Sequence, residues 1–81
     1  MMKVIVNVFL KAGVLDSQGK AVHHALESLH FNNVSDVRIG KQIVLNLDES
    51  DETKAMADVT KMCEELLANT VIEDYNIELV K

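Results

Sequence analysis

The feature that most constrains the fold is the order in which two hydrophobic periods follow one another along the 81 residues. Apolar residues alternate with a period of two in residues 3–11, 42–48 and 75–79, which is typical of strands with one buried face. Val37 and Ile39 predict a further short strand over residues 35–39. The Gly40-Lys41 pair then predicts a tight turn that joins this strand to the next one as an antiparallel hairpin.

Two segments between these strands have the helical period instead. Residues 18–30 carry one apolar stripe, and Asp16 or Ser17 is expected to be the N-cap of that helix. A second stripe follows the acidic loop 48–52, with Ser50 as the expected N-cap. Asn32-Asn33 and Asn69 are the expected ends of the two helices.

The resulting element order is β-α-β-β-α-β, which predicts one α+β domain over residues 1–81. The pattern is ferredoxin-like, with a four-stranded antiparallel sheet and both helices on one face. The outer face of that sheet is predicted to be unusually apolar, which is typical of a covered surface. We therefore expect the chain to be oligomeric through its sheet, as a homodimer or homotetramer, with these interface residues: Ile5, Phe9, Val44 and Val80.

Composition excludes several classes of protein. The net charge of −5 argues against nucleic-acid binding, which depends on clustered positive charge. A single cysteine cannot form an internal disulfide. No apolar stretch approaches the ~20 residues of a membrane span, and the N-terminus has no signal-peptide core. We expect a cytoplasmic protein without nucleic-acid or membrane partners, small enough that oligomerisation would help its stability.

Candidate chemistry is sparse. His23 and His24 point in different directions on a helix, so no metal site is predicted. Cys63 lies on an apolar stripe and is expected to be a buried structural thiol. Gly19 falls in the first turn of a helix, where glycine is costly, which a close approach by a partner or ligand would explain. Arg38, the only arginine, is expected either in a solvated turn or as an anchor for an acidic partner.

Functions that share this topology can be compared with the residues present. An RNA-binding sheet needs aromatic residues on its central strands, and only Phe9 could serve. Acylphosphatase-like and heavy-metal-associated domains need an arginine or a Cys-x-x-Cys pair in the first loop, residues 12–17, which has neither. An ACT-like small-molecule-sensing regulatory domain stays open, because residues 15–19 resemble its turn before the first helix.

The chain also resembles a specific family along nearly its whole length. It is similar to the small PurS-type subunit of phosphoribosylformylglycinamidine synthase, although Ser17 and Thr70 stand where that family usually has proline. The resemblance is carried by three motifs: Leu15-Asp16-x-Gln18-Gly19 with Ala25-Leu26, Val37-Arg38-x-Gly40-Lys41, and Met62-Cys63-x-x-Leu66-Leu67-Ala68-Asn69-x-Val71-Ile72-Glu73-x-Tyr75.

This resemblance implies a non-catalytic subunit of a glutamine-dependent, ATP-consuming ligase of purine biosynthesis. The complex converts formylglycinamide ribonucleotide to formylglycinamidine ribonucleotide. The small subunit would bridge a glutaminase and a large synthetase subunit and assist ammonia transfer between them. The chain itself would hold no cofactor, since ATP and magnesium belong to the synthetase subunit.

Polar residues that lie in these motifs but outside the apolar stripes are the predicted contacts with the two larger subunits. No catalytic or metal-binding residue is predicted. The predicted contact residues are Asp16, Gln18, Gly19, Arg38, Lys41, Asn69 and Glu73.

Overall fold

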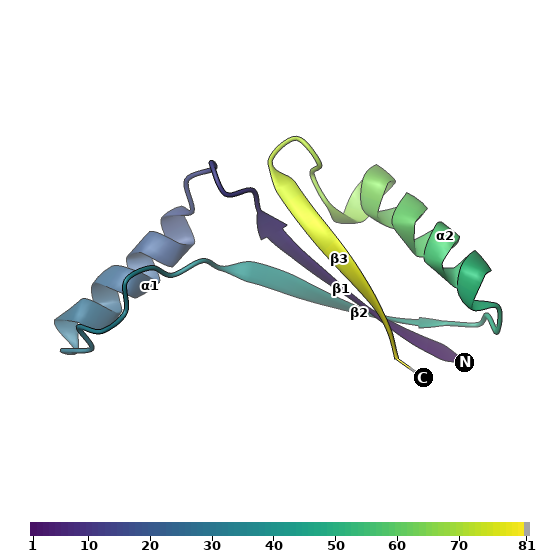
Figure 1. Ribbon diagram of the computed structural model, residues 1–81, viewed down its shortest axis with the longest axis horizontal. Helices are drawn as coiled ribbons and strands as arrows, with labels where there is room; N and C mark the ends of the chain where they lie inside the picture. Colours follow the sequence, from purple (N-terminus) through teal and green to yellow (C-terminus); the bar gives the residue numbers. More distant parts are fainter. Residues whose placement is uncertain (81) are drawn as a thin grey trace.

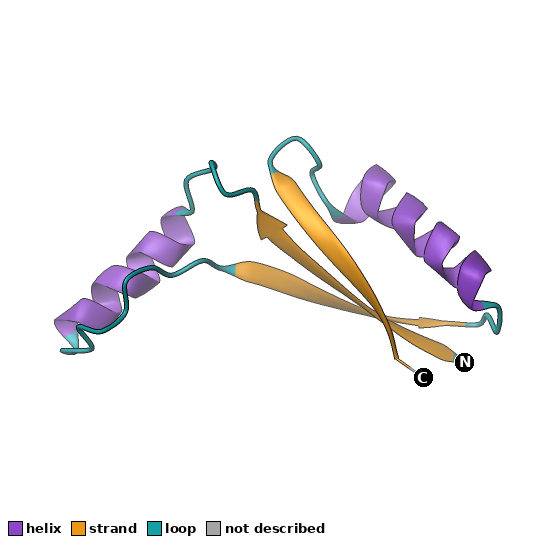
Figure 2. Cartoon of the chain, viewed as in Figure 1, coloured by secondary structure: helices purple, strands orange, loops and turns teal. Residues whose placement is uncertain are grey.

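The computed structural model describes residues 1–80. Two α-helices, one π-helical turn and three strands follow one another along this part of the chain (Figure 2). In chain order they are β1 (Met2–Leu10), α1 (Ser17–Ser28), β2 (Gly40–Leu47), α2 (Glu52–Met62), the π-helix η1 (Cys63–Leu67) and β3 (Glu73–Val80).

The three strands form one antiparallel sheet in the order β2-β1-β3. In the central strand, Val4, Val6 and Val8 are buried on one face, as their alternation predicted. The α2 helix packs over this face, and its Ala55 and Val59, together with Cys63, are fully buried. The α+β class is therefore confirmed, and the core lies between α2 and one face of the sheet.

The predicted fourth strand and its hairpin are wrong for the described chain. Residues 34–39 form no strand, because β1 ends at Leu10 and leaves them without a neighbouring strand. Gly40 does not form a turn; it pairs with Phe9 as the first residue of β2. A Cβ at Gly40 would lie 2.7 Å from the Val8 carbonyl oxygen, so a close backbone approach explains this glycine.

Only one of the two helices covers the sheet. Figure 1 shows α1 beyond the end of the strands, whereas α2 runs beside β3. A compact chain of this length has a radius of gyration of about 12 Å, but this chain has 16.1 Å. The prediction of both helices on one face is therefore wrong for a single chain. The apolar stripe of α1 (Ala21, Val22, Ala25, Leu26 and Leu29) is largely exposed.

The helix ends follow local capping rules. Asp16 caps α1 as expected, but the helix ends at Ser28, before Asn32-Asn33. His30 has φ = 70°, and its N–H bonds the Glu27 carbonyl while the Phe31 N–H bonds that of Leu26. These two bonds define a Schellman motif that stops the helix.

The start of α2 also differs from the expectation. Its N-cap is Asp51, whose Oδ1 accepts from the backbone N–H groups of Thr53 and Lys54, so the expectation for Ser50 is wrong. No helix in residues 1–80 is long and apolar enough to cross a membrane.

Candidate functional site

Segments distant in sequence meet at one end of the sheet. A cavity of about 220 Å³ opens there. We call it the junction cavity, and it collects four of the predicted contact residues. Its lining consists of Val8, Phe9, Leu10, Asp16, Gln18, Ile39, Gly40, Lys41 and Glu73.

Asp16 is the central polar group at this junction. Its Oδ1 accepts from the Gly19 N–H at 2.8 Å, and its Oδ2 accepts from the Ile39 N–H at 2.6 Å. The hydrogen bond from Ile39 contributes most to lowering the pKa of Asp16 below its ordinary value, followed by that from Gly19. The ionised carboxylate therefore connects the start of α1 to the start of β2.

Gly19 and His23 extend this connection along α1. A Cβ at Gly19 would lie 2.3 Å from the Val37 carbonyl oxygen, and the His23 Nε2 donates to the Val34 carbonyl oxygen at 2.8 Å. The close approach that glycine permits is therefore made by the chain's own backbone. We call α1 with residues 29–39 the α1 arm, because these contacts hold the helix against the returning chain.

Arg38 has a defined position outside any turn. Its Nη1 donates to the Val14 carbonyl oxygen at 3.1 Å, and its Nη2 donates to that of Lys11 at 3.0 Å. The guanidinium therefore holds the first loop while staying exposed at the surface. Lys41 lies nearby on the cavity lining and is exposed.

Asn69 and Glu73 hold the loop between η1 and β3. The Asn69 N–H donates to Glu73 Oε1 at 2.6 Å, and the Val71 N–H donates to Asn69 Oδ1 at 3.2 Å. Asn69 itself does not line the junction cavity. It joins the site through Glu73, which does.

The outer face of the sheet carries the four predicted interface residues. Phe9 is 40% exposed and Val44 is 47% exposed, and Ile5 and Val80 share the same face. A row of polar side chains that the sequence pattern did not predict lies between them. The Gln42 Nε2 donates to Asn7 Oδ1 at 3.2 Å, and the Asn7 Nδ2 donates to Asn76 Oδ1 at 2.9 Å. Only the register of three strands brings these amides into one row.

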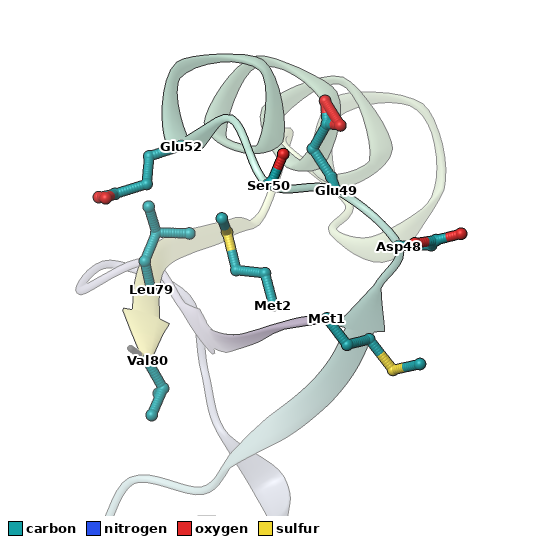
Figure 3. A pocket seen from close by; sticks show the side chains of 8 residues that line it. All are labelled: Met1, Met2, Asp48, Glu49, Ser50, Glu52, Leu79 and Val80. Atoms are coloured by element: carbon teal, nitrogen blue, oxygen red, sulfur yellow. The ribbon is translucent and has the colours of Figure 1, made fainter.

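A larger cavity of about 530 Å³ lies at the opposite end of the sheet. Figure 3 shows Met2 at its centre and Asp48 pointing away from it. Of the predicted site residues it contains only Val80. Its lining consists of Met1, Met2, Asp48, Glu49, Ser50, Glu52, Leu79 and Val80.

Two side chains with reactive groups, Cys63 and Tyr75, are held by burial or by a hydrogen bond. Cys63 is buried, and burial is the main cause that raises the pKa of its thiol. The Tyr75 hydroxyl donates to Glu64 Oε2 at 2.7 Å, which raises the pKa of Tyr75 to about 12. In residues 1–80 we find no group of three or more potential metal ligands. The junction cavity is lined by both polar and apolar side chains.

Comparison with known proteins agrees with this description. The family model for PurS, described as phosphoribosylformylglycinamidine (FGAM) synthase, matches residues 3–81. The phosphoribosylformylglycinamidine synthase subunit PurS of Bacillus subtilis (strain 168) is 56% identical over 79 residues, covering 98% of this chain and 93% of the relative.

Solved structures show the same fold. The crystal structure of Methanocaldococcus jannaschii PurS is 43% identical, with a TM-score of 0.91, and the match covers 100% of this chain and 98% of that one. A chain in the structure of PurLQS from Thermotoga maritima is 32% identical, with a TM-score of 0.89, covering 98% and 96%. These matches favour the synthase hypothesis over the ACT-like sensor. The chain therefore belongs to the PurS family of phosphoribosylformylglycinamidine synthase.

Proposed function

We propose that this chain, a PurS subunit of phosphoribosylformylglycinamidine synthase in purine biosynthesis, bridges the glutaminase and the synthetase subunits of that complex. In this role it performs no chemistry and assists the transfer of ammonia from one subunit to the other. The structure of PurLQS from Thermotoga maritima, in which a similar chain is present, supports assembly with larger partners.

The observation that carries the proposal is the convergence at the junction cavity. Asp16 and Glu73 line the cavity, whereas Arg38 is not part of its lining. The three residues come from separate segments, and each bonds backbone groups of its own chain. A site built this way holds polar side chains in place beside apolar ones, and the cavity lining contains no Ser, Thr or Cys that could act as a nucleophile. Such a surface suits recognition of a partner.

Self-association is part of the same proposal. The apolar stripe of α1 and the outer face of the sheet are two separate exposed surfaces. Covering both with further copies of this chain yields a dimer or a tetramer and buries apolar area that the single chain leaves in water.

The remaining parts of the proposal concern cofactors and location. ATP and magnesium act in the synthetase subunit, and this chain binds neither. The complex works in the cytoplasm.

Reconstitution tests the bridging role. The two larger subunits are assayed for synthesis of formylglycinamidine ribonucleotide with and without this chain, once with glutamine and once with free ammonia. We expect the chain to restore glutamine-dependent synthesis and to change the ammonia-dependent rate much less, because its role is to connect the two active sites. Equal glutamine-dependent rates without the chain would contradict the proposal.

A further inference from the structure

The strand β2 is the least covered strand of the sheet. It pairs with β1 along one edge, and no strand in residues 1–80 pairs with its other edge. On the inner face of the sheet, Ile43 and Leu45 lie opposite the buried valines of β1 but stay partly exposed, because α2 lies closest to β3. β2 therefore offers both an unpaired edge, which is a template for another strand, and an apolar face without a helix over it.

The α1 arm carries a helix and an extended segment that would complete this sheet. Its helix exposes an apolar stripe, with Val22 40% exposed and Leu29 66% exposed. Its residues 34–38 make no backbone–backbone hydrogen bond within the described chain. In a ferredoxin-like sheet the second strand pairs with the third, and both helices lie over one face. The arm thus holds the missing helix and strand away from its own sheet.

The path of the chain at Gly40 explains why the arm does not lie on its own β2. A hairpin would need the chain to reverse at Gly40, but this residue already pairs with Phe9 at the start of β2. Residues 34–39 therefore continue the line of β2 instead of lying beside it (Figure 1). The hydrogen bonds of Asp16 and His23 hold the arm on that path. Exchange of such an element between two copies is a low-cost route to a dimer.

The continuous segment of residues 34–47 can pair with itself across a twofold axis. Antiparallel pairing of two such segments adds the strand of each arm to the free β2 edge of the other copy. Opposite residues of an antiparallel pair share one face of a sheet, so Val37 stays with the apolar side chains when it lies opposite Ile43 or Leu45. Both registers place the axis within residues 40–41.

The exposed area of the single chain agrees with this exchange. A compact protein of 9.0 kDa has a solvent-accessible surface of about 4,900 Å². This chain has 5822 Å². For two copies the excess is about 1,800 Å², which lies within the ~1,200–2,000 Å² that a stable interface buries.

We infer that two copies of this chain exchange their α1 arms, so that residues 34–39 of one copy pair with β2 of the other and the α1 stripe packs on the inner face of the other sheet. The inference rests on the proposed function, because it names the surface and the symmetry of the self-association proposed there. Gly40 and Lys41 also line the junction cavity. The exchange therefore brings the junction cavities of two copies to one twofold axis.

Cross-linking of the isolated chain tests the position of the axis. Lys41→Cys places an exposed thiol within one residue of the axis, and a short bismaleimide should join two such chains into a covalent dimer. Thr53→Cys places an exposed thiol on α2 and is the matched control, which should stay a single chain on a denaturing gel. The native Cys63 is buried, so the wild-type chain should not be joined either.

A charge on α1 tests the packing of its stripe. Val22→Glu places a carboxylate on the stripe, and His24→Glu places one on the opposite side of the same helix. Both positions are exposed in a single chain, so neither variant disturbs a core within it. By sedimentation we expect Val22→Glu to raise the dissociation constant of the dimer at least about tenfold, and His24→Glu to leave it near the wild-type value.

The outcomes separate this inference from the proposed function. Asn7→Cys places a thiol at the centre of the outer face of the sheet. Cross-linking of Asn7→Cys without cross-linking of Lys41→Cys would overturn the exchange and assign the dimer contact to the outer face. Equal dissociation constants for the two glutamate variants would also overturn it. A wild-type mass of one chain at micromolar concentration would contradict self-association itself.

Discussion

At the scale of single residues, glycine decides how closely the two halves of the α1 arm can approach. Gly19 lies in the first turn of α1, where glycine is unfavourable for the helix itself. Glycine is needed here because any larger residue would clash: the Val37 carbonyl oxygen lies where a Cβ would be placed. A backbone carbonyl cannot move away by a rotamer change as a side chain can. A Cβ at Gly19 would therefore force α1 and residues 29–39 apart.

Gly19→Ala should therefore destabilise the chain, by roughly 1–3 kcal/mol as for other overpacked sites. Gly13→Ala is the matched control, since nothing lies within 4 Å of a Cβ there. The control should be neutral or slightly stabilising. Urea unfolding of both variants at one protein concentration measures the difference, and equal midpoints would show that the arm adapts without cost.

At the scale of elements, hydrogen bonds at the ends of the helices determine where each helix starts and stops. The α1 helix stops at a Schellman motif whose left-handed residue is His30, at a position where glycine is usual. A side chain in this conformation costs free energy that glycine avoids.

His30→Gly should raise the free energy of unfolding by about 0.5–1 kcal/mol, because it removes that strain. In residues 1–80, His30 is the only non-glycine residue with positive φ. Asn33→Gly should therefore stabilise nothing and serves as the control. Thermal unfolding compares the two variants, and a lower midpoint for His30→Gly would contradict this account.

The contact between η1 and β3 can be followed through the absorbance of Tyr75. Tyr75 is the only tyrosine and the chain has no tryptophan, so its phenolate absorbance can be titrated alone. The hydrogen bond to Glu64 is the main cause that raises the pKa of Tyr75 to about 12, from 10.0 for the free side chain. Its contribution to stability is thus present below pH 10 and is lost as the pH rises toward 12.

Glu64→Gln should bring the pKa of Tyr75 back toward 10, because the charged acceptor is gone. Glu65→Gln changes the neighbouring carboxylate, which makes no bond to Tyr75, and should leave the titration unchanged. Ultraviolet absorbance against pH gives both values. A Tyr75 pKa near 10 in the wild-type chain would mean that the bond to Glu64 is absent in solution.

At the scale of the whole molecule, the described chain is extended, with a radius of gyration of 16.1 Å. The described residues extend over 48 × 27 × 14 Å, and the α1 helix lies beyond the end of the strands (Figure 1). A helix with an exposed apolar stripe gains little from folding alone, since most helical stability comes from packing that stripe. We therefore expect the α1 arm to be covered in solution by another copy of the chain.

Light scattering on the isolated chain should give the mass of a dimer or a tetramer at micromolar concentration. Phe9→Asp places a charge on the outer face of the sheet and should lower that mass or weaken association. Thr53→Asp adds the same charge to an exposed position on α2 and is the control. A wild-type mass of one chain would rule out oligomerisation.

Much of the local structure follows from the sequence. The alternation in residues 3–11 and 75–79 predicted β1 and β3, and the helical stripes predicted α1 and α2, because each pattern reflects geometry within a few residues. The family was identifiable from three motifs. The seven predicted contact residues lie at or beside one junction, although their contacts with the larger subunits stay a prediction.

Only the tertiary structure decided which segments become neighbours. The alternation at Val37 and Ile39 indicates an extended backbone. Whether that segment pairs with another strand depends on where β1 ends, and β1 ends at Leu10, 27 residues before Val37. In the same way, Gly19 and Arg38 stood out in the sequence, yet their partners, the carbonyls of Val37, Val14 and Lys11, were set by the path of the whole arm. Local periodicity depends on adjacent residues, whereas hydrogen-bond partners and covered surfaces depend on long-range packing, and packing of α1 is not completed within one chain.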